Sequence, residues 1–288
     1  MSAVPSTPLP GYIAPLGQRV QAWVRQLLAF VVVAAILLPI FWIVLTAFKQ
    51  PRDVYSLANA LWFTPTVDNF YTVFDHPWNL GSKLLNSFVV ASGTVLIAMP
   101  LALCSAYAFS RFEFPLKQPL FFAIIASQFI PAAVVVLPYF LMFKQLGWLD
   151  SRSALVLVNL SIVLPYAVWM IKGFIDAVPV EMEESAMVDG ASRLRVLWEM
   201  VVPVALPGVI TAAVFSFTLT WNEFLFALIL TKQDALTLPI GLIGFRTERG
   251  DLWELMASAG MIITLPMVLI SLVVHKQFIG SLIAGSTK

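Results

Sequence analysis

The residues best suited to chemistry gather in one polar stretch of this chain, from Glu181 to Gly208, which separates two long apolar runs. Its charged residues stand out because the rest of the sequence has few. They are Glu181, Glu183, Glu184, Asp189, Arg193, Arg195 and Glu199. The apolar residues between them keep helical spacing, which predicts helices with one apolar side. We expect such a loop to bind a soluble protein.

Catalytic and metal-binding patterns are absent from the sequence. His76 and His275 fall on opposite sides of the predicted membrane spans, and no cluster of Cys and His residues occurs. The single cysteine, Cys104, lies inside an apolar run, where a small buried residue is the expected role. No Gly-Lys dipeptide occurs, so the chain has no Walker A loop. We therefore predict a chain that is no enzyme and binds no cofactor itself.

The composition indicates an integral membrane protein. Apolar residues make up 60% of the chain and charged residues 11%, whereas a soluble domain carries about 25% charge. The net charge of +1 gives no reason to expect a nucleic acid partner.

Six stretches of at least 18 residues contain no Asp, Glu, Lys, Arg or His. At about 1.5 Å per residue each can cross a bilayer core roughly 30 Å thick. The spans must be helices because lipid offers the backbone no hydrogen bonds, and packed membrane helices tolerate the proline that each contains. The stretches are 26–48, 84–110, 118–143, 153–171, 200–222 and 255–274. The predicted fold class is an all-α polytopic membrane protein with six transmembrane helices.

Six spans place both termini on one face of the membrane. The connections 49–83, 144–152 and 231–254 then lie on the opposite face. Lys and Arg divide nine against eight between the faces, so the positive-inside rule gives no orientation. We predict a tail over 1–24, a membrane domain over 25–280 and a second tail over 281–288.

The polar stretch predicts two short helices outside the bilayer, joined by a sharp turn. Pro179 suits a first helical turn, Gly190 a left-handed end, and Ser192 the cap of the second helix. In that second helix the apolar residues share one face. These are Leu194, Leu197, Trp198 and Val201. A hairpin lying on lipid headgroups is the alternative interpretation.

The order of residues in this loop resembles the EAA loop of permease subunits in ATP-binding-cassette importers. The family triplet stands as Glu184-Ser185-Ala186, with serine in place of the first alanine, and Asp189-Gly190-Ala191 follows. Other segments resemble the carbohydrate branch, and in particular the smaller six-span permease of maltose-type systems. They are Ala106–Phe112, Trp221–Phe224, Thr237–Leu242 and Gln277–Gly285.

The resemblance implies partners, an orientation and a set of docking residues. The loop, residues 176–202, would be cytoplasmic, with both termini inside a bacterial or archaeal cytoplasmic membrane. It would dock on one of two ATP-binding subunits, which hold ATP and Mg. A second, different permease and an extracytoplasmic solute-binding protein would complete the assembly. The expected docking residues are Glu181, Glu184, Ser185, Ala186, Asp189, Gly190, Ala191, Leu194, Leu197 and Trp198.

Polar residues inside lipid spans usually face a cavity or a partner helix, so they are candidates for a substrate path. They are Asn86, Ser87, Gln128, Asn159, Ser216, Thr220, Trp221, Asn222 and Glu223. Neutral donors and acceptors beside aromatic rings suit a sugar or polyol. A packing role is the alternative for each Ser and Thr, and an ion pair or interfacial position for Glu223.

The connection 231–254 contains an apolar run with Gly and Pro, from Ala235 to Phe245, that is too short to span a membrane. We predict that it contacts the solute-binding protein through Leu238, Pro239, Ile240 and Gly241; packing on the protein's own helices is the alternative.

The predicted function is that of a membrane-spanning subunit of an ATP-driven sugar, polyol or glycoside importer. The same machinery could carry a polyamine, phosphonate or peptide instead. An ion-gradient-driven carrier would favour intramembrane acids, of which Glu223 is the sole candidate here. A non-transporting membrane sensor with a docking hairpin is a further alternative.

Overall fold

The computed structural model describes residues 16–248 and 250–285, so parts of both predicted tails, 1–15 and 286–288, lie outside the described residues. Within those ranges the chain is mostly helical. Among the described residues, five helices are long and apolar enough to cross a membrane, and a bent helix pair makes a sixth crossing if it counts as one span. The predicted all-α polytopic fold is confirmed.

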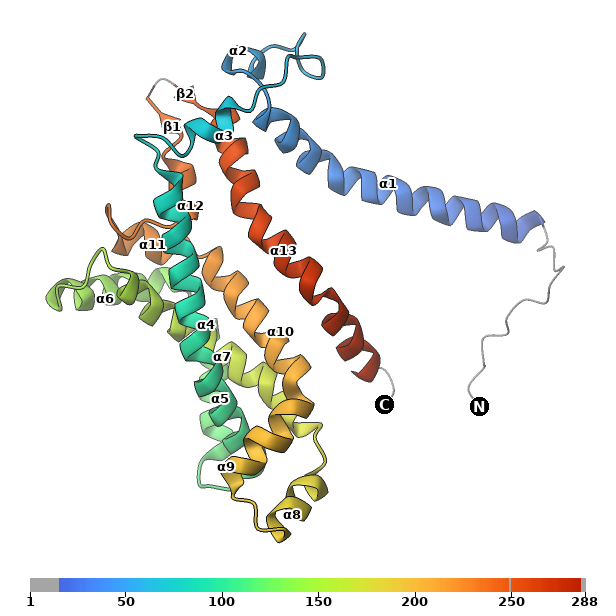
Figure 1. The fold of residues 1–288 in the computed structure, drawn as a ribbon, viewed down its shortest axis with the longest axis vertical. Helices are drawn as coiled ribbons and strands as arrows, with labels where there is room; N and C mark the ends of the chain where they lie inside the picture. Colours follow the sequence, from blue (N-terminus) through green and yellow to red (C-terminus); the bar gives the residue numbers. More distant parts are fainter. Residues whose placement is uncertain (1–15, 249, 286–288) are drawn as a thin grey trace.

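Five long helices form the frame of the molecule (Figure 1). Each stays continuous around an internal proline. They are α1 (Leu16–Ala47), α4 (Leu80–Arg111), α7 (Arg152–Asp176), α10 (Val202–Trp221) and α13 (Trp253–Gly285). Helices α4, α7 and α10 pack on one another, with alanines such as Ala102 and Ala167 buried between them. Small residues let membrane helices approach closely, and this gives the bundle its tight centre.

The third predicted span is not a single rod. Helix α5 (Lys117–Ala126) continues into a 3₁₀ turn η1 (Ser127–Phe129), and α6 (Ala132–Gln145) then leaves at an angle of 94°. The cause is local, because Pro131 has no N–H and disfavours helical backbone in the residue before it. Ile130 is accordingly extended, with φ −73° and ψ 118°.

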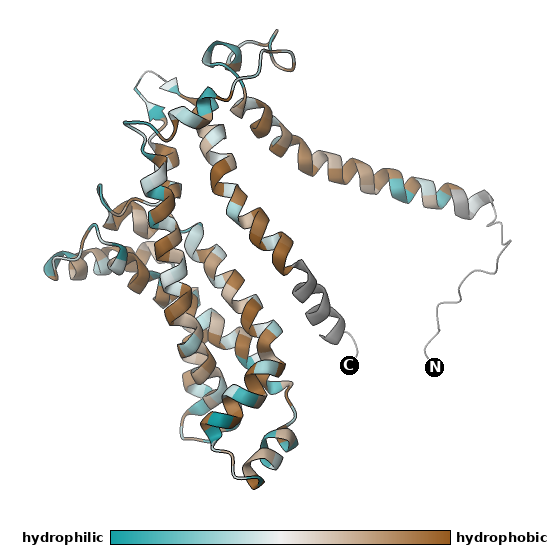
Figure 2. Ribbon diagram, viewed as in Figure 1, coloured by the Kyte–Doolittle hydropathy of each residue, from teal (hydrophilic) through white to brown (hydrophobic). Residues whose placement is uncertain are grey.

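Helix α1 diverges from the bundle and contacts it through α13 (Figure 1). None of its most apolar window is buried, and side chains such as Trp23 and Phe30 are largely exposed. Figure 2 shows this helix as hydrophobic along most of its length. An apolar helix of this kind needs lipid or another protein chain around it.

Several short elements lie at the two ends of the molecule (Figure 1). One end carries α2 (Pro51–Val54), α3 (Asp68–Thr72), α12 (Leu238–Ile243) and an antiparallel ladder of β1 (Arg246–Thr247) and β2 (Gly250–Asp251), with Arg246 opposite Asp251. Helix α11 (Leu225–Leu230) contacts α6 and α7. The other end carries α8 (Val180–Val188) and α9 (Arg193–Val196).

Candidate functional site

The docking loop, residues 176–202, begins and turns where its sequence predicts. Pro179 precedes α8 in extended backbone. Gly190 has a φ of +89°, and its N–H donates to the carbonyl of Met187 at 3.1 Å. The Oγ of Ser192 accepts a hydrogen bond from the N–H of Arg195 at 3.3 Å, which caps the next helix. The predicted glycine turn and serine cap are confirmed.

The second arm of the loop differs from the prediction. It is not a separate short helix, because α9 continues through a wide π turn, η2 (Leu197–Val201), directly into α10. Nothing between Ser192 and Pro203 breaks a helix, and Pro203, which lacks an N–H, follows the π turn. The arm is therefore the cytoplasmic-side extension of a membrane helix if the loop lies inside the cell.

The apolar face predicted for this arm is divided between two environments. Leu197 and Val201 are buried in the core that they share with α4 and α7. Leu197 is therefore a core residue, although the sequence analysis expected it to dock on a partner. Leu194 and Trp198 stay 64% and 49% exposed, and Val188 at the end of α8 is 87% exposed. We refer to these three exposed apolar residues of the loop as its apolar tip.

The predicted docking residues around the turn line one hollow of about 350 Å³. They include Ser185, Ala186, Asp189, Gly190 and Ala191, which Arg195 and Glu199 border from the other arm. Glu181 and Glu184 are exposed on α8. The loop thus presents a recessed turn with an apolar tip beside it.

Glu183 anchors α8 to the membrane bundle, a role that the sequence analysis did not assign to it. Its Oε1 lies 2.6 Å from the Nε of Arg111 at the end of α4, and the Tyr107 hydroxyl donates to its Oε2 at 3.0 Å. The side chains of Arg111 and Glu183 are only 9% and 3% exposed. Arg111 and Glu183 both lie in segments that the sequence analysis singled out. No pattern of neighbouring residues, however, predicts that the two form an ion pair.

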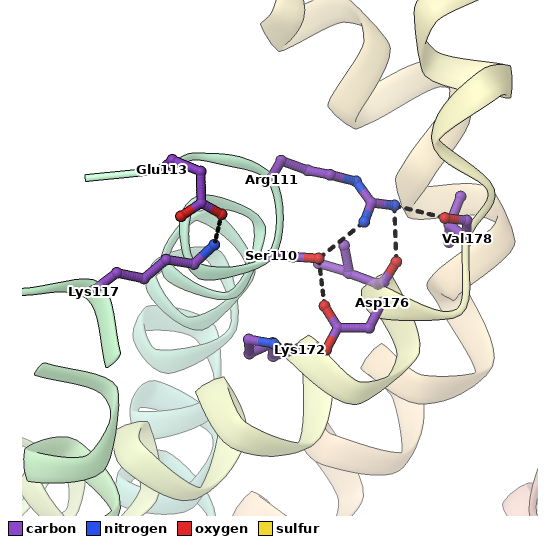
Figure 3. A network of polar contacts seen from close by, with 8 residues as sticks. Ser110, Arg111, Glu113, Lys117, Lys172, Asp176 and Val178 are labelled. Carbon is purple, nitrogen blue, oxygen red and sulfur yellow. Dashed lines mark hydrogen bonds and ion pairs between the residues drawn. The ribbon is translucent and has the colours of Figure 1, made fainter. Parts of the chain in front are cut away.

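Arg111 also holds the end of α7 (Figure 3). Its Nη2 donates to the carbonyls of Ile175 and Val178 at 2.9 and 2.7 Å, and its Nη1 donates to the Ser110 hydroxyl at 3.0 Å. Ser110 in turn donates to Asp176, which also binds Lys172 at 2.6 Å. One guanidinium group therefore joins α4, α7 and α8, an arrangement that positions helices and performs no catalysis.

Asn86 and Ser87, predicted in the substrate path, anchor an outer loop. The Nδ2 of Asn86 donates to the carbonyls of Asp234 and Leu236 at 2.9 and 2.8 Å, and its Oδ1 accepts from the Nε of Arg152 at 2.7 Å. The Ser87 hydroxyl accepts from the N–H of Leu238 at 2.8 Å. Both residues are buried. The structure gives them a structural role in place of the predicted substrate contact.

Other predicted path residues are also engaged by the protein itself. Trp221 is buried and donates to the carbonyl of Ile263 at 3.2 Å. Glu223 accepts from the N–H groups of Phe226 and Ala227 at 2.7 and 3.0 Å, so it caps the start of α11. Asn159 and Asn222 each donate to the carbonyl four residues earlier in their helices.

The remaining predicted path residues lie apart. Ser216 and Thr220 are buried, and their hydroxyls have no hydrogen-bond partner among the described residues. Gln128 is exposed beside the break between η1 and α6. The predicted set does not converge on one site within this chain.

The loop 231–235 is held by Asp150, which precedes α7 with a φ of +56°. Its carboxylate accepts four consecutive backbone N–H groups, those of Lys232, Gln233, Asp234 and Ala235, at 2.9 to 3.1 Å. Burial opposes ionisation of this carboxyl, but the four donors outweigh it and lower the pKa of Asp150.

The residues predicted to contact a binding protein are mostly packed inside the chain. Leu238 and Gly241 are buried, and Pro239 and Ile240 are partly buried. A Cβ at residue 241 would lie 2.7 Å from Cδ of Lys83, so α12 sits directly on α4. The contact with a solute-binding protein therefore stays a prediction, and the exposed residues of this connection include Lys232–Asp234, Ile243–Gly244 and the β1–β2 ladder.

Comparison with known proteins assigns the chain. Residues 98–281 match the family described as "Binding-protein-dependent transport system inner membrane component". The chain belongs to this family. The predicted resemblance to permease subunits of ATP-binding-cassette importers is confirmed, and this permease is a multi-pass inner membrane protein.

Relatives of this permease are similar over nearly their whole length. A diacetylchitobiose uptake permease of Streptomyces coelicolor is 30% identical over 265 residues, which cover 90% of this chain and 95% of the relative. A trehalose/maltose permease of Thermococcus litoralis is 30% identical over 258 residues, covering 88% and 91%.

The fold of this permease is shared with a solved transporter. A crystal structure of a bacterial ABC transporter involved in the import of the acidic polysaccharide alginate contains a chain that matches with a TM-score of 0.78. That match covers 92% of this chain and 99% of the other at 18% identity.

Proposed function

We propose that this permease forms half of the membrane path of an ATP-driven importer for a sugar, polyol or glycoside, and that it couples to a separate ATPase through the docking loop. The observation that carries the proposal is the attachment of both arms of this loop to the membrane helices. Its first arm is joined to α4 and α7 through Arg111 and Glu183, its second arm is continuous with α10, and its tip exposes apolar residues.

This attachment suggests how force would travel. The apolar tip of Val188, Leu194 and Trp198 would pack against the ATPase, since exposed apolar groups of this kind favour a protein contact. Closure of the ATP-bound subunits would move α8 and α9 in the same direction, as one unit. Because these helices are tied to α4, α7 and α10, the bundle would rock as one body around a site in the bilayer.

The other partners follow from exposed surfaces and from the relatives. The unburied length of α1 offers a contact for a second, different permease. The exposed β1–β2 ladder offers one for a solute-binding protein, and a structural relative was solved with a pentasaccharide-bound periplasmic protein. ATP and Mg would bind to the two ATPase subunits.

The cargo class rests on the relatives and on the chemistry of the bundle. The relatives described above carry the names of diacetylchitobiose and of trehalose and maltose. Neutral hydroxyl and amide groups among aromatic rings, as in Gln128 and Ser161 beside Tyr139, suit the same class.

The test is reconstitution with the partner subunits in vesicles. Uptake should require ATP and the binding protein, whereas an ion-gradient carrier would need only the gradient. Trp198→Ala should weaken co-purification of the ATPase and lower uptake. Trp169→Ala is the matched control, since Trp169 is 52% exposed on a membrane helix away from the loop. Equal ATPase binding and uptake by the Trp198 variant would overturn the docking role.

A further inference from the structure

The break between η1 and α6 opens a cavity of about 420 Å³. Its walls come from four parts of the chain: the break itself, α6 at Tyr139, the middle of α7 at Ser161, and α11 at Phe226. This volume falls within the range of roughly 300–1,000 Å³ that is typical of small-molecule sites. We call it the break cavity.

The break cavity lies near the middle of the membrane. Ser161 is nine residues from the start of α7, or about 14 Å along the helix at 1.5 Å per residue. On the other side, Phe129 is twelve residues from the start of α5, or about 18 Å. The two lengths together match a bilayer core of about 30 Å.

Irregular backbone at this depth needs hydrogen-bond partners that lipid cannot supply. No side chain caps the start of α6 at Pro131, and Ile130 is 52% exposed. Because lipid cannot satisfy free backbone groups, such breaks occur where they are buried in protein or line a water-filled cavity. The described residues of this chain leave the break uncovered, which favours a water-filled cavity.

The polar groups that line the break cavity are neutral. No charged residue is among the lining residues. The hydroxyls of Ser127 and Ser161 donate to helix carbonyls at 2.6 and 2.7 Å, which leaves their oxygens free to accept. The Gln128 amide has no hydrogen-bond partner among the described residues, so it retains two donors and an acceptor.

Aromatic rings complete the lining. Tyr139 stacks on Phe143 with ring centroids 6.2 Å apart, and it meets Phe226 edge-on at 5.8 Å. Phe226 is buried, which fixes the position of this cluster. Phe129 lines the same cavity and is 82% exposed. The apolar ring faces suit the C–H groups of a sugar ring, and the neutral hydrogen-bonding groups suit its hydroxyls.

We propose that the break cavity is a sugar subsite of the translocation path, in which the Gln128 amide binds sugar hydroxyls beside the rings of Phe129 and Tyr139. This proposal rests on the proposed function and deepens it by assigning the substrate contact to one place in this chain.

The test uses cysteine labelling of the assembled transporter in nanodiscs, where both membrane faces are open to solvent. In a Cys104→Ser background, Gln128→Cys and the control Gln145→Cys at the end of α6 are exposed to a charged methanethiosulfonate reagent. Maltose, trehalose and diacetylchitobiose are first offered to the wild-type transporter, and the imported sugar is then used with its loaded binding protein and ATP.

The expected result is that the thiol of the Gln128→Cys variant reacts with the charged reagent and that the imported sugar slows this reaction several-fold, while the labelling of the Gln145→Cys control is unaffected. A thiol at residue 128 that reacts equally fast with and without sugar, or that resists the charged reagent because lipid or the partner subunit covers it, overturns the subsite. If the wild type imports none of the three sugars, the sugar form of the proposed function fails, and the subsite fails with it.

Transport kinetics supply a second readout. Gln128→Ala should lower kcat/KM for uptake about three- to tenfold, the loss expected for one or two hydrogen bonds, while Gln145→Ala leaves uptake unchanged. Basal ATP hydrolysis by the complex should be unaltered by Gln145→Ala, because this residue lies in neither the docking loop nor the break cavity. Unchanged uptake by the Gln128 variant would contradict the proposal while leaving the importer function intact.

Discussion

Arg111 and Glu183, which are 72 positions apart in the sequence, form a buried ion pair in which Nε lies 2.6 Å from Oε1. The pair sits at the corner where α4, α7 and α8 meet, and each partner makes further hydrogen bonds. A buried charge that loses its partner is strongly destabilising, whereas an exposed pair contributes little. The corner is therefore the part of the docking loop most sensitive to mutation.

Arg111→Ala should destabilise this corner by about 3–5 kcal/mol, because Glu183 would be left buried without its cation. We expect α8 to become more accessible to protease in membranes, and uptake to fall relative to ATP hydrolysis. Arg195→Ala is the control, since its ion pair with Glu199 is 65% and 59% exposed. If both variants behave alike, the corner has no special role in coupling.

Gly190→Pro should leave the protein in the membrane and abolish transport. Proline fixes φ near −65°, whereas Gly190 has a φ of +89°, so the turn between the two arms cannot form. Membrane content measured by immunoblot should stay near the wild-type level while sugar-stimulated ATP hydrolysis is lost. Ser185→Ala, which restores the family residue in the exposed first arm, serves as the neutral control. Normal transport by Gly190→Pro would refute the docking role of the loop.

Asp150→Asn should weaken the outer loop in a pH-dependent manner. The pKa of Asp150 is lowered in the folded protein, so its stabilising contribution is complete above the unfolded value of about 3.9 and is lost as the pH falls through the lower folded value. The variant should have a lower Tm than the wild type at pH 7, and the gap should close as the pH drops below about 4. A gap in Tm that is constant with pH would show that the carboxylate charge is irrelevant.

Gly208→Ala should destabilise the packing of α10 on α7. An added Cβ would lie 2.1 Å from Cγ of Phe174, so one of the helices must shift. Overpacking of this kind costs about 1–3 kcal/mol. Gly173→Ala is the control within the same helix pair, because nothing lies within 4 Å of its added Cβ. Thermal unfolding in detergent should separate the two variants, and equal Tm values would argue against close packing at Gly208.

The amino-acid sequence by itself determined the features that depend on neighbouring residues. The positions of the membrane spans follow from hydropathy, since a charged residue inside lipid is costly wherever the chain places it. The turn at Gly190 and the cap at Ser192 follow from backbone and side-chain preferences that act over three or four residues. Even the break at Pro131 has a local cause, although the uncharged stretch 118–143 suggested one continuous span.

Only the tertiary structure decided which residues meet. Leu197 and Trp198 are adjacent and both apolar, yet one enters the core and the other stays exposed, because the core contributed by α4 and α7 lies on one side of the arm. Asn86 looked suited to a substrate, but its side-chain amide donates to loop carbonyls 148 and 150 residues away. Such contacts depend on how the helices pack, and no local pattern in the sequence encodes them.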